Sequence, residues 1–212
     1  MDAATIAAAR PVRRLVASGA GKEPQLILHG RGSPLRAELE RFISDEYRKH
    51  FDADVREFMP TFLALHDATG RISAAVGCRS AAFEKLFLEI YTDKPIEAMI
   101  TERVSVEVPR EQIVEIGSLA CRNGRSAMAI IRALSPYLID AGFSWAAFTA
   151  SSTVVTVLSR LRLEPLALCV AHSSKLGPSR SAWGSYYKHD PVVMAGRLRD
   201  GIEALDDVPR IQ

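Results

Sequence analysis

The stretch Glu111-Gln-Ile-Val-Glu-Ile-Gly-Ser-Leu-Ala-Cys-Arg-Asn-Gly-Arg-Ser126 decides the fold of this chain. It predicts a buried strand that carries one carboxylate, Glu115, followed by a short basic glycine loop and the start of a long apolar helix. Regular alternation places Ile113, Glu115, Gly117 and Leu119 on one face of the strand, and Val114, Ile116, Ser118 and Ala120 on the other. A candidate general base therefore lies just before the N-terminus of a helix.

The loop after this strand suits an anion. Gly124 supplies backbone freedom, and Ser126 is the expected N-cap of the helix that follows. Free N–H groups and the positive end of the helix dipole favour a phosphate at such a position. Arg122 and Arg125 flank Gly124 and could pair with phosphate, although both could equally be solvated loop side chains. The segment suggests a phosphate-bearing acyl carrier laid against the strand that holds Glu115.

The composition is that of a folded globular protein. The chain has 212 residues, of which 48% are hydrophobic and 25% charged, and its net charge of +2 does not indicate nucleic acid. No run approaches the ~20 apolar residues of a membrane span, and the N-terminus lacks the apolar core of a secretory signal. Cys78, Cys121 and Cys169 lack metal-ligand spacing and suit free thiols in a reducing compartment. We therefore expect a cytoplasmic protein without a metal site.

Hydrophobic periodicity predicts the order of helices and strands. The expected helices cover 34–50, a segment from Pro95, 126–141 and 151–161, with a short one after Pro191, and the expected strands cover 25–29, 61–66, 72–78, the surroundings of Glu115, 144–149 and 165–171. The valines of 151–161 also fit a strand, but their spacing favours a helix. This order indicates a single mixed α/β sheet. We assign 1–33 to an N-terminal arm, 34–200 to one domain and 201–212 to a C-terminal tail.

Several separate motifs occur in register along the chain. They are Leu86-Phe-Leu-Glu-Ile-Tyr91 with Lys94-Pro-Ile-Glu97, Ile113-Val-Glu-Ile-Gly-Ser-Leu-Ala120, Trp145-Ala-Ala-Phe-Thr149 and Trp183-Gly-Ser-Tyr-Tyr187. From about residue 33 to 196, the chain thereby resembles the thermostable hemolysin family. That family is similar in fold to the GNAT acyltransferases and the acyl-homoserine-lactone synthases. The resemblance implies an α/β (α+β) protein with a GNAT-like, mixed and mostly antiparallel central sheet flanked by helices.

The resemblance also implies an acyl donor. In the GNAT enzymes, the strand equivalent to 113–120 splays from its neighbour to hold a pantetheine arm, and the following loop receives phosphate. The usual loop is Arg/Gln-x-x-Gly-x-Gly/Ala, whereas Arg122-Asn-Gly-Arg-Ser-Ala127 has a single glycine, one place early. A carrier protein with one phosphate fits this shorter loop more easily than coenzyme A does. Ser118 also stands where the hemolysin family usually has Asn, which weakens any role that needs a side-chain amide.

The site implied by the resemblance has three parts. The catalytic residues are Glu115, which would deprotonate the acceptor, and Tyr187, whose phenol would protonate the leaving thiol. The residues that would bind the phosphopantetheine of acyl-CoA or acyl-ACP are Ser118, Leu119, Ala120, Arg122, Gly124, Arg125 and Ser126. The residues that would bind the substrates are Arg79, Glu89, Tyr91, Glu97 and Trp183. Each part has a structural alternative, because buried carboxylates pair with arginines and C-terminal aromatics often cover a core edge.

Three functions are compatible with the sequence. The first is an acyltransferase that moves an acyl group from acyl-carrier protein or acyl-CoA to a small amine or alcohol. The second is a membrane-active hemolysin, which requires an exposed amphipathic helix or a secretion route, and neither is visible. The third is a non-catalytic module that binds an acyl carrier. The scattered histidines and the absence of Gly-x-Ser-x-Gly give no support to serine-hydrolase chemistry. We favour the acyltransferase.

Overall fold

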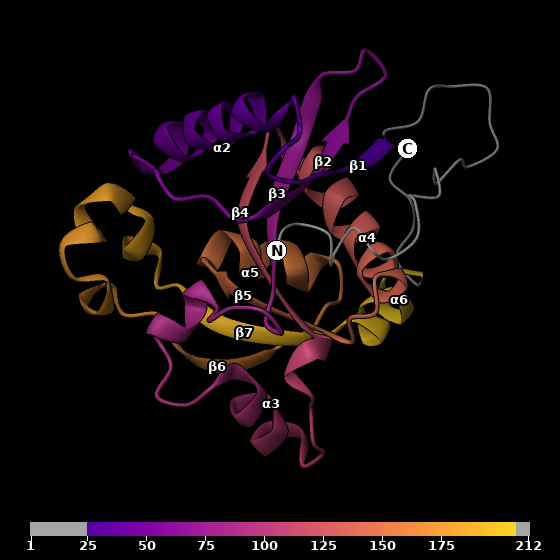
Figure 1. Ribbon diagram of the computed structural model, residues 1–212, viewed down its shortest axis with the longest axis vertical. Helices are drawn as coiled ribbons and strands as arrows, with labels where there is room; N and C mark the ends of the chain where they lie inside the picture. Colours follow the sequence, from indigo (N-terminus) through magenta and orange to yellow (C-terminus); the bar gives the residue numbers. More distant parts are fainter. Residues whose placement is uncertain (1–24, 207–212) are drawn as a thin grey trace.

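Seven strands form one sheet in the computed structural model, which describes residues 25–206 (Figure 1). The strands are β1 (Gln25–His29), β2 (Thr61–His66), β3 (Ile72–Ser80), β4 (Ile113–Cys121), β5 (Trp145–Ala150), β6 (Leu166–Val170) and β7 (Val192–Arg197). They lie in the order β1-β2-β3-β4-β5-β7-β6. Every neighbouring pair is antiparallel except β4 and β5, which run parallel. The sheet is therefore mixed and mostly antiparallel, as predicted.

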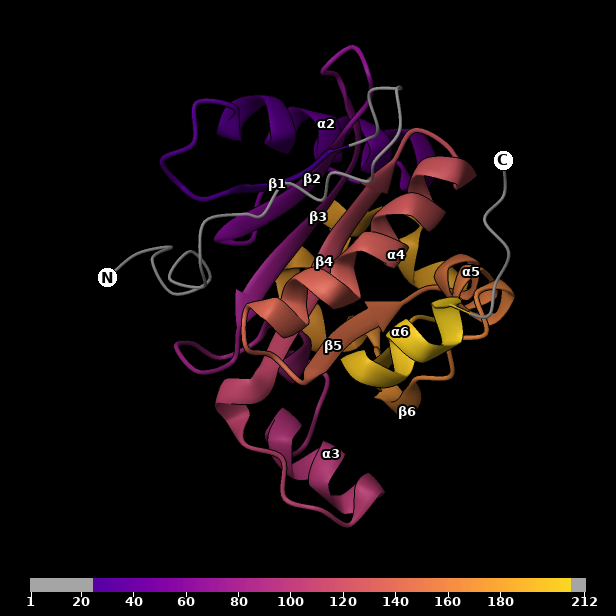
Figure 2. The ribbon, with the colours of Figure 1, turned by 90° about the vertical axis from the view of Figure 1, so that its right-hand side faces the viewer.

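Helices cover both faces of the sheet. They are α2 (Arg36–Phe51), α3 (Ile96–Val104), α4 (Gly124–Asp140), α5 (Ser152–Arg160) and α6 (Leu198–Asp206), with the 3₁₀ segments η1 (Phe87–Ile90), η2 (Arg110–Gln112), η3 (Ser173–Trp183) and η4 (Tyr186–His189). Helix α2 packs on β3 and β4 from one side, whereas α4 lies on the opposite side beside α6 (Figure 2). The sheet is thus the middle layer of three.

Each face of the sheet has its own apolar core. Leu39 of α2 and Phe62 of β2 belong to one cluster, and Ile130 of α4 and Val114 of β4 belong to another. A further cluster, which includes Ile100 of α3, joins that helix to η1 and β6. Burial on both faces explains why β4 reads as a nearly continuous apolar run. It also explains why a charged side chain within that run needs partners nearby.

The alternation predicted for β4 fails after Gly117, because the strand contains a β-bulge. Gly117 and Ala120 are three positions apart on β4, whereas their partners on β3, Gly77 and Ala75, are two positions apart. The extra residue is accommodated at Ser118, whose φ of 51° lies in the left-handed region. Leu119 consequently packs with the α4 core, and Ala120 packs under α2. Both residues lie on the face opposite to the one predicted.

Two further elements differ from the sequence prediction. Helix α4 begins at Gly124, and its N-cap is Asn123 rather than Ser126; the Asn123 Oδ1 accepts a hydrogen bond from the Ser126 N–H at 2.9 Å. An amide oxygen three residues before that N–H has the geometry of an N-cap, which Ser126 itself lacks. After Pro191 the chain first forms strand β7 and only then the short helix α6. Strand β7 lies between β5 and β6, so its pairing depends on distant parts of the chain.

Other sequence assignments are confirmed. The hairpin appears as β2 and β3, the strand at 25–29 appears as β1, and the ambiguous segment 151–161 forms helix α5. Most of the predicted arm (residues 1–24) and part of the predicted tail (residues 207–212) lie outside the described residues. The proposed domain boundaries therefore stay a prediction.

Asn123→Ala tests the observed cap of α4. Loss of an Asn N-cap typically lowers the free energy of unfolding by about 1 kcal/mol, because the N-terminal N–H groups lose an acceptor. Urea denaturation should show this loss, whereas Arg125→Ala, in the exposed first turn, should change stability by less than about 0.5 kcal/mol. Equal stability of the Asn123 variant and the parent protein would contradict this assignment of the cap.

Candidate active site

Strands β4 and β5 separate partway along their length and leave a cavity between them. Their paired register ends at Ile116 and Phe148; beyond it, β4 pairs only with β3, and β5 pairs only with β7. The cavity has a volume of about 1130 Å³. Its lining extends from Tyr91 and Trp183 on the side of η1 and η3 to residues of α4, α5 and α6. The opening in the sheet thus connects its two faces.

Glu115 lies on the wall of this cavity and is only 2% exposed. Its Oε2 accepts a hydrogen bond from the Phe87 N–H and its Oε1 accepts one from the Leu88 N–H, both at 2.9 Å. Burial raises the pKa of Glu115 above its ordinary value, although the two N–H groups and Arg79 act in the opposite direction. A carboxylate has about four acceptor sites, so each oxygen can still accept a proton or another hydrogen bond.

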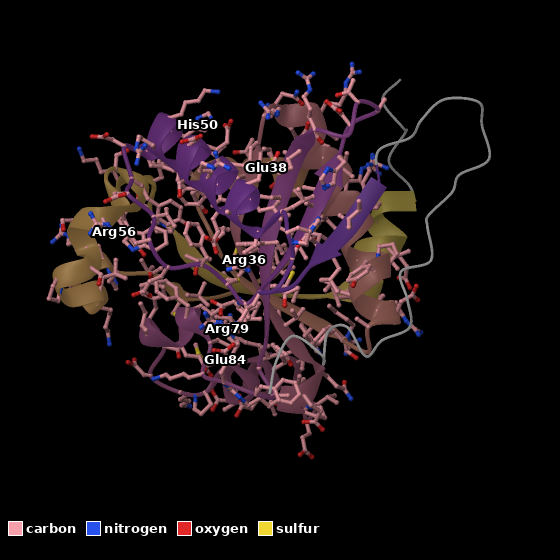
Figure 3. The ribbon with its side chains drawn as sticks, turned by 45° about the horizontal axis from the view of Figure 1, so that its top comes forward. Arg36, Glu38, His50, Arg56, Arg79 and Glu84 are labelled. Carbon is pink, nitrogen blue, oxygen red and sulfur yellow. The ribbon has the colours of Figure 1, made fainter. Side chains whose placement is uncertain are left out.

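Arg79 of β3 is the cation beside Glu115. Its Nε lies 4.0 Å from the Glu115 Oε2 and 3.6 Å from the Glu84 Oε1. Figure 3 shows Arg79 and Glu84 next to each other. The Arg79 Nε is buried and has no hydrogen-bond partner among the described residues, and the residue lines the cavity. The site therefore holds a buried guanidinium on its wall, close to the Glu115 carboxylate.

An aromatic cluster supplies two phenols to the cavity. The hydroxyls of Tyr91 and Tyr187 form a hydrogen bond, and the Trp183 ring meets the Tyr187 ring edge to face, with centroids 6.0 Å apart. All three residues line the cavity. Burial raises the pKa of Tyr91 to about 12 and raises that of Tyr187 well above its ordinary value. Both phenols are therefore neutral near pH 7, and one of their two protons is used in the bond between them.

The predicted donor-binding segment divides into two parts. Ser118 and Leu119, at the bulge, line the cavity. Ala120 lies under α2, and Arg122, Gly124, Arg125 and Ser126 are not in the cavity lining. The Arg122 Nε donates to the Ile72 carbonyl at 2.7 Å, and the Arg122 guanidinium lies over the Phe42 ring. The role of this loop in binding phosphate stays a prediction.

Two predicted substrate residues, Glu89 and Glu97, do not line the cavity. Arg110 lies between them, with its Nη1 at 2.7 Å from the Glu89 Oε1 and 2.6 Å from the Glu97 Oε2. Burial alone would raise the pKa of Glu89, but hydrogen bonds from Arg110 and from backbone N–H groups outweigh it and lower the pKa to about 2. These carboxylates are held by an ion-paired cluster next to the site, so their contacts are those of structural residues.

Sequence reasoning missed Met59, which lines the cavity beside the bulge. A Cβ atom at Gly117 would lie 2.5 Å from the Met59 Cε, and a Cβ atom at Gly77 would lie 2.8 Å from the Met59 Cβ. Gly77 and Gly117 are paired across β3 and β4, so together they make the hollow that the methionine fills. The glycine of the Glu-Ile-Gly motif was the available signal, because a strand glycine often marks a close approach.

The comparisons with known proteins give one family and a set of solved structures with a similar fold. The sequence model of the family described as thermostable hemolysin matches residues 29–202. A comparison with curated proteins gave no significant match. Among solved structures, the acyl-homoserine-lactone synthase LasI is similar with a TM-score of 0.58 at 11% identity, covering 89% of this chain and 98% of that chain.

Two other solved structures are similar to the same extent. FeeM, an N-acyl amino acid synthase from uncultured soil microbes, has a TM-score of 0.57 at 11% identity and covers 84% of this chain and 98% of its own. The third is BjaI, a CoA-dependent acyl-homoserine lactone synthase in complex with SAM and isopentyl-CoA. It has a TM-score of 0.55 at 10% identity, and the match covers 89% of this chain and 95% of that chain. At such low identity these likenesses show the fold alone.

Residues 25–206 contain neither a candidate metal site nor a candidate membrane-spanning helix. No group of three or more His, Cys, Asp or Glu side chains in that range could hold a metal ion. In the same range, no helix has the length and apolar character to cross a membrane.

Alanine substitutions of the two glycines test the packing of Met59. Gly77→Ala should lower the free energy of unfolding by about 1–3 kcal/mol, because the Met59 Cβ is fixed to the backbone and cannot withdraw. Gly117→Ala should lower the free energy of unfolding clearly less, because the Met59 Cε that the new methyl group meets is the mobile end of that side chain. Gly32→Ala, with nothing within 4 Å, is the control in urea denaturation. Equal losses at Gly77 and Gly32 would show that Met59 does not occupy this hollow.

Proposed function

The chain belongs to the thermostable hemolysin family, and from that premise we propose that it is an acyltransferase. It moves an acyl group from acyl-carrier protein or acyl-CoA to a small amine or alcohol. The observation that carries this proposal is the buried Glu115 on the wall of a cavity that opens between two separating strands. The fold shared with synthases named for acyl-homoserine lactones and N-acyl amino acids supports it.

The donor thioester is proposed to enter between β4 and β5. Beyond Ile116, β4 has no strand partner on the β5 side, so its backbone groups there are free to bind a ligand. The bulge at Ser118 turns the backbone locally, and N–H groups from this segment would orient the thioester carbonyl. The two faces joined by the cavity give the donor and the acceptor separate approaches to the same carbon atom.

The chemistry follows from the groups on the cavity wall. Glu115 removes a proton from the acceptor amine or alcohol, whose lone pair attacks the thioester carbonyl carbon. The carbon–sulfur bond then breaks, and the Tyr187 phenol gives its proton to the leaving thiolate. The hydrogen bond between the Tyr187 and Tyr91 hydroxyls orients that phenol. The Arg79 guanidinium, which lines the cavity beside Glu115, binds an oxygen of the acceptor or of the developing oxyanion.

Donor identity and location are parts of the same proposal. The single-glycine loop after β4 favours a carrier protein with one phosphate over coenzyme A. The chain has three free cysteines, Cys78, Cys121 and Cys169, among the described residues, which fits the cytoplasm, where both kinds of thioester occur.

A carrier-binding module without catalysis is the second candidate. Two observations favour it: both oxygens of Glu115 already accept backbone hydrogen bonds, and Arg122 and Arg125 do not line the cavity. Such a protein would hold an acyl carrier without consuming it.

Thiol release distinguishes the two candidates. The protein is mixed with acyl-carrier-protein and acyl-CoA donors and a panel of amines and alcohols, while free thiol and intact product masses are followed. Donor-selective release is expected, and Glu115→Gln should reduce it by about 10²–10⁴-fold, since general base catalysis is lost. Glu111→Gln, an exposed carboxylate of the same segment, is the control. A stable complex without release would establish the binding module.

The proposed base also predicts the pH dependence of turnover. Glu115 acts only when ionised, and its raised pKa means that the ionised form is lost at a higher pH than for an exposed glutamate. The value of kcat/KM should therefore fall with decreasing pH, with a midpoint above the ordinary value of about 4.3. A pH–rate profile that stays level down to that value would exclude Glu115 as the base.

A further inference from the structure

We propose that Arg110 is a positioning residue for Glu115, acting through Glu89 and the 3₁₀ segment η1. This inference rests on the proposed function, because it concerns the carboxylate assigned there as the base. Arg110 does not line the cavity, and its side chain is 27% exposed. It therefore touches neither substrate nor Glu115, and its effect must pass through the intervening contacts.

The first contact is a forked ion pair between Arg110 and Glu89. The Arg110 Nη1 donates to the Glu89 Oε1 at 2.7 Å, and the Arg110 Nη2 donates to the Glu89 Oε2 at 2.8 Å. The Glu89 side chain is only 5% exposed, so its charge requires this partner. The fork fixes the plane of the carboxylate, which a lysine ammonium could not do.

The second contact ties the Glu89 carboxylate to the backbone on both sides of η1. Its Oε2 accepts a hydrogen bond from the Leu86 N–H at 2.8 Å, and its Oε1 accepts one from the Ile96 N–H at 3.0 Å. Glu89 itself belongs to η1 (Phe87–Ile90). The ion pair therefore holds the start of η1 and the start of α3 together.

The third contact reaches the reactive carboxylate. The Phe87 and Leu88 N–H groups, which open η1, donate to the two oxygens of Glu115 at 2.9 Å. Leu86, held by Glu89, directly precedes these two residues. Each link is a short hydrogen bond with a buried carboxylate acceptor, and such bonds are stronger than neutral ones. Movement of η1 would remove donors that favour the ionised form of Glu115.

Arg110 also steadies the segment that holds the cation beside Glu115. Its Nε donates to the Ala81 carbonyl at 2.8 Å, and its Nη2 donates to the Glu84 carbonyl at 3.3 Å. The Glu84 carboxylate lies 3.6 Å from the Arg79 Nε. The charged and titratable groups around Glu115 are thus Arg79 from β3, Glu84 from the loop after it, and Glu89 and Tyr91 in and after η1. Arg110 contacts two of these segments at once.

The test is the pH dependence of Arg110 variants. In Arg110→Met, the acid limb of kcat/KM should move to higher pH by about one unit, a tenfold loss of rate on that limb, because Glu115 loses the donors that favour its charge. Arg110→Lys, which keeps the charge but not the fork, should show a smaller shift. Lys94→Met, which removes a nearby exposed cation outside this chain of contacts, should leave the profile unchanged.

A spectroscopic readout separates this inference from the proposed function. The protein is labelled with ¹³C at glutamate side-chain carboxyls, and the Glu115 signal is identified by its absence in Glu115→Gln. Its titration in Arg110→Met should move upward even if no acyl transfer is ever found. A Glu115 titration in that variant that is unchanged or moved downward, with the fold intact by circular dichroism, would overturn the role of Arg110.

Discussion

A buried carboxylate must find hydrogen-bond donors, and the surroundings of Glu115 are arranged to meet that requirement. Glu115 itself is only 2% exposed, so bulk water contributes little to solvating its charge. Its hydrogen-bond donors come from the backbone of η1, which is held by Glu89 and Arg110. A charge in the sheet thus explains why a short 3₁₀ segment, a helix start and an ion-paired cluster meet at one place. Loss of the η1 donors would leave the buried charge without its two backbone hydrogen bonds.

The cavity results from two local departures from regular sheet geometry. The first is the end of pairing between β4 and β5, and the second is the bulge at Ser118, which turns Leu119 toward α4. Gly77 and Gly117 add a hollow that Met59 fills. A thioether chain is flexible and polarisable, so this part of the wall can adapt to what lies against it. The cavity is therefore bounded by β4 and β5 and, at one part of its wall, by the flexible Met59 side chain.

Most elements could be predicted from periodicity, because each buries one face or both. The segment 151–161 was decided by apolar spacing, and that helix is confirmed as α5. Strand β7 was missed, since its six residues gain their partners from β5 and β6, far along the chain. The bulge was missed because alternation assumes a regular strand. The placement of Glu115 followed from its motif, but its donors are the N–H groups of Phe87 and Leu88, which no side chain marks in a sequence.

The parallel contact between β4 and β5 has a mechanical consequence. Within the single sheet, four residue pairs, from Ile113–Trp145 to Ile116–Phe148, join strands β1 to β4 with strands β5 to β7. This short contact, the seam, is the only strand pairing within residues 25–206 between the two halves of the sheet, β1 to β4 and β5 to β7. Rotation of one half relative to the other would widen or narrow the gap between β4 and β5. Each half would keep its own antiparallel hydrogen bonds. Glu115 is one of the paired residues that join the two halves. It would therefore move little while the distance between the unpaired ends of β4 and β5 changed.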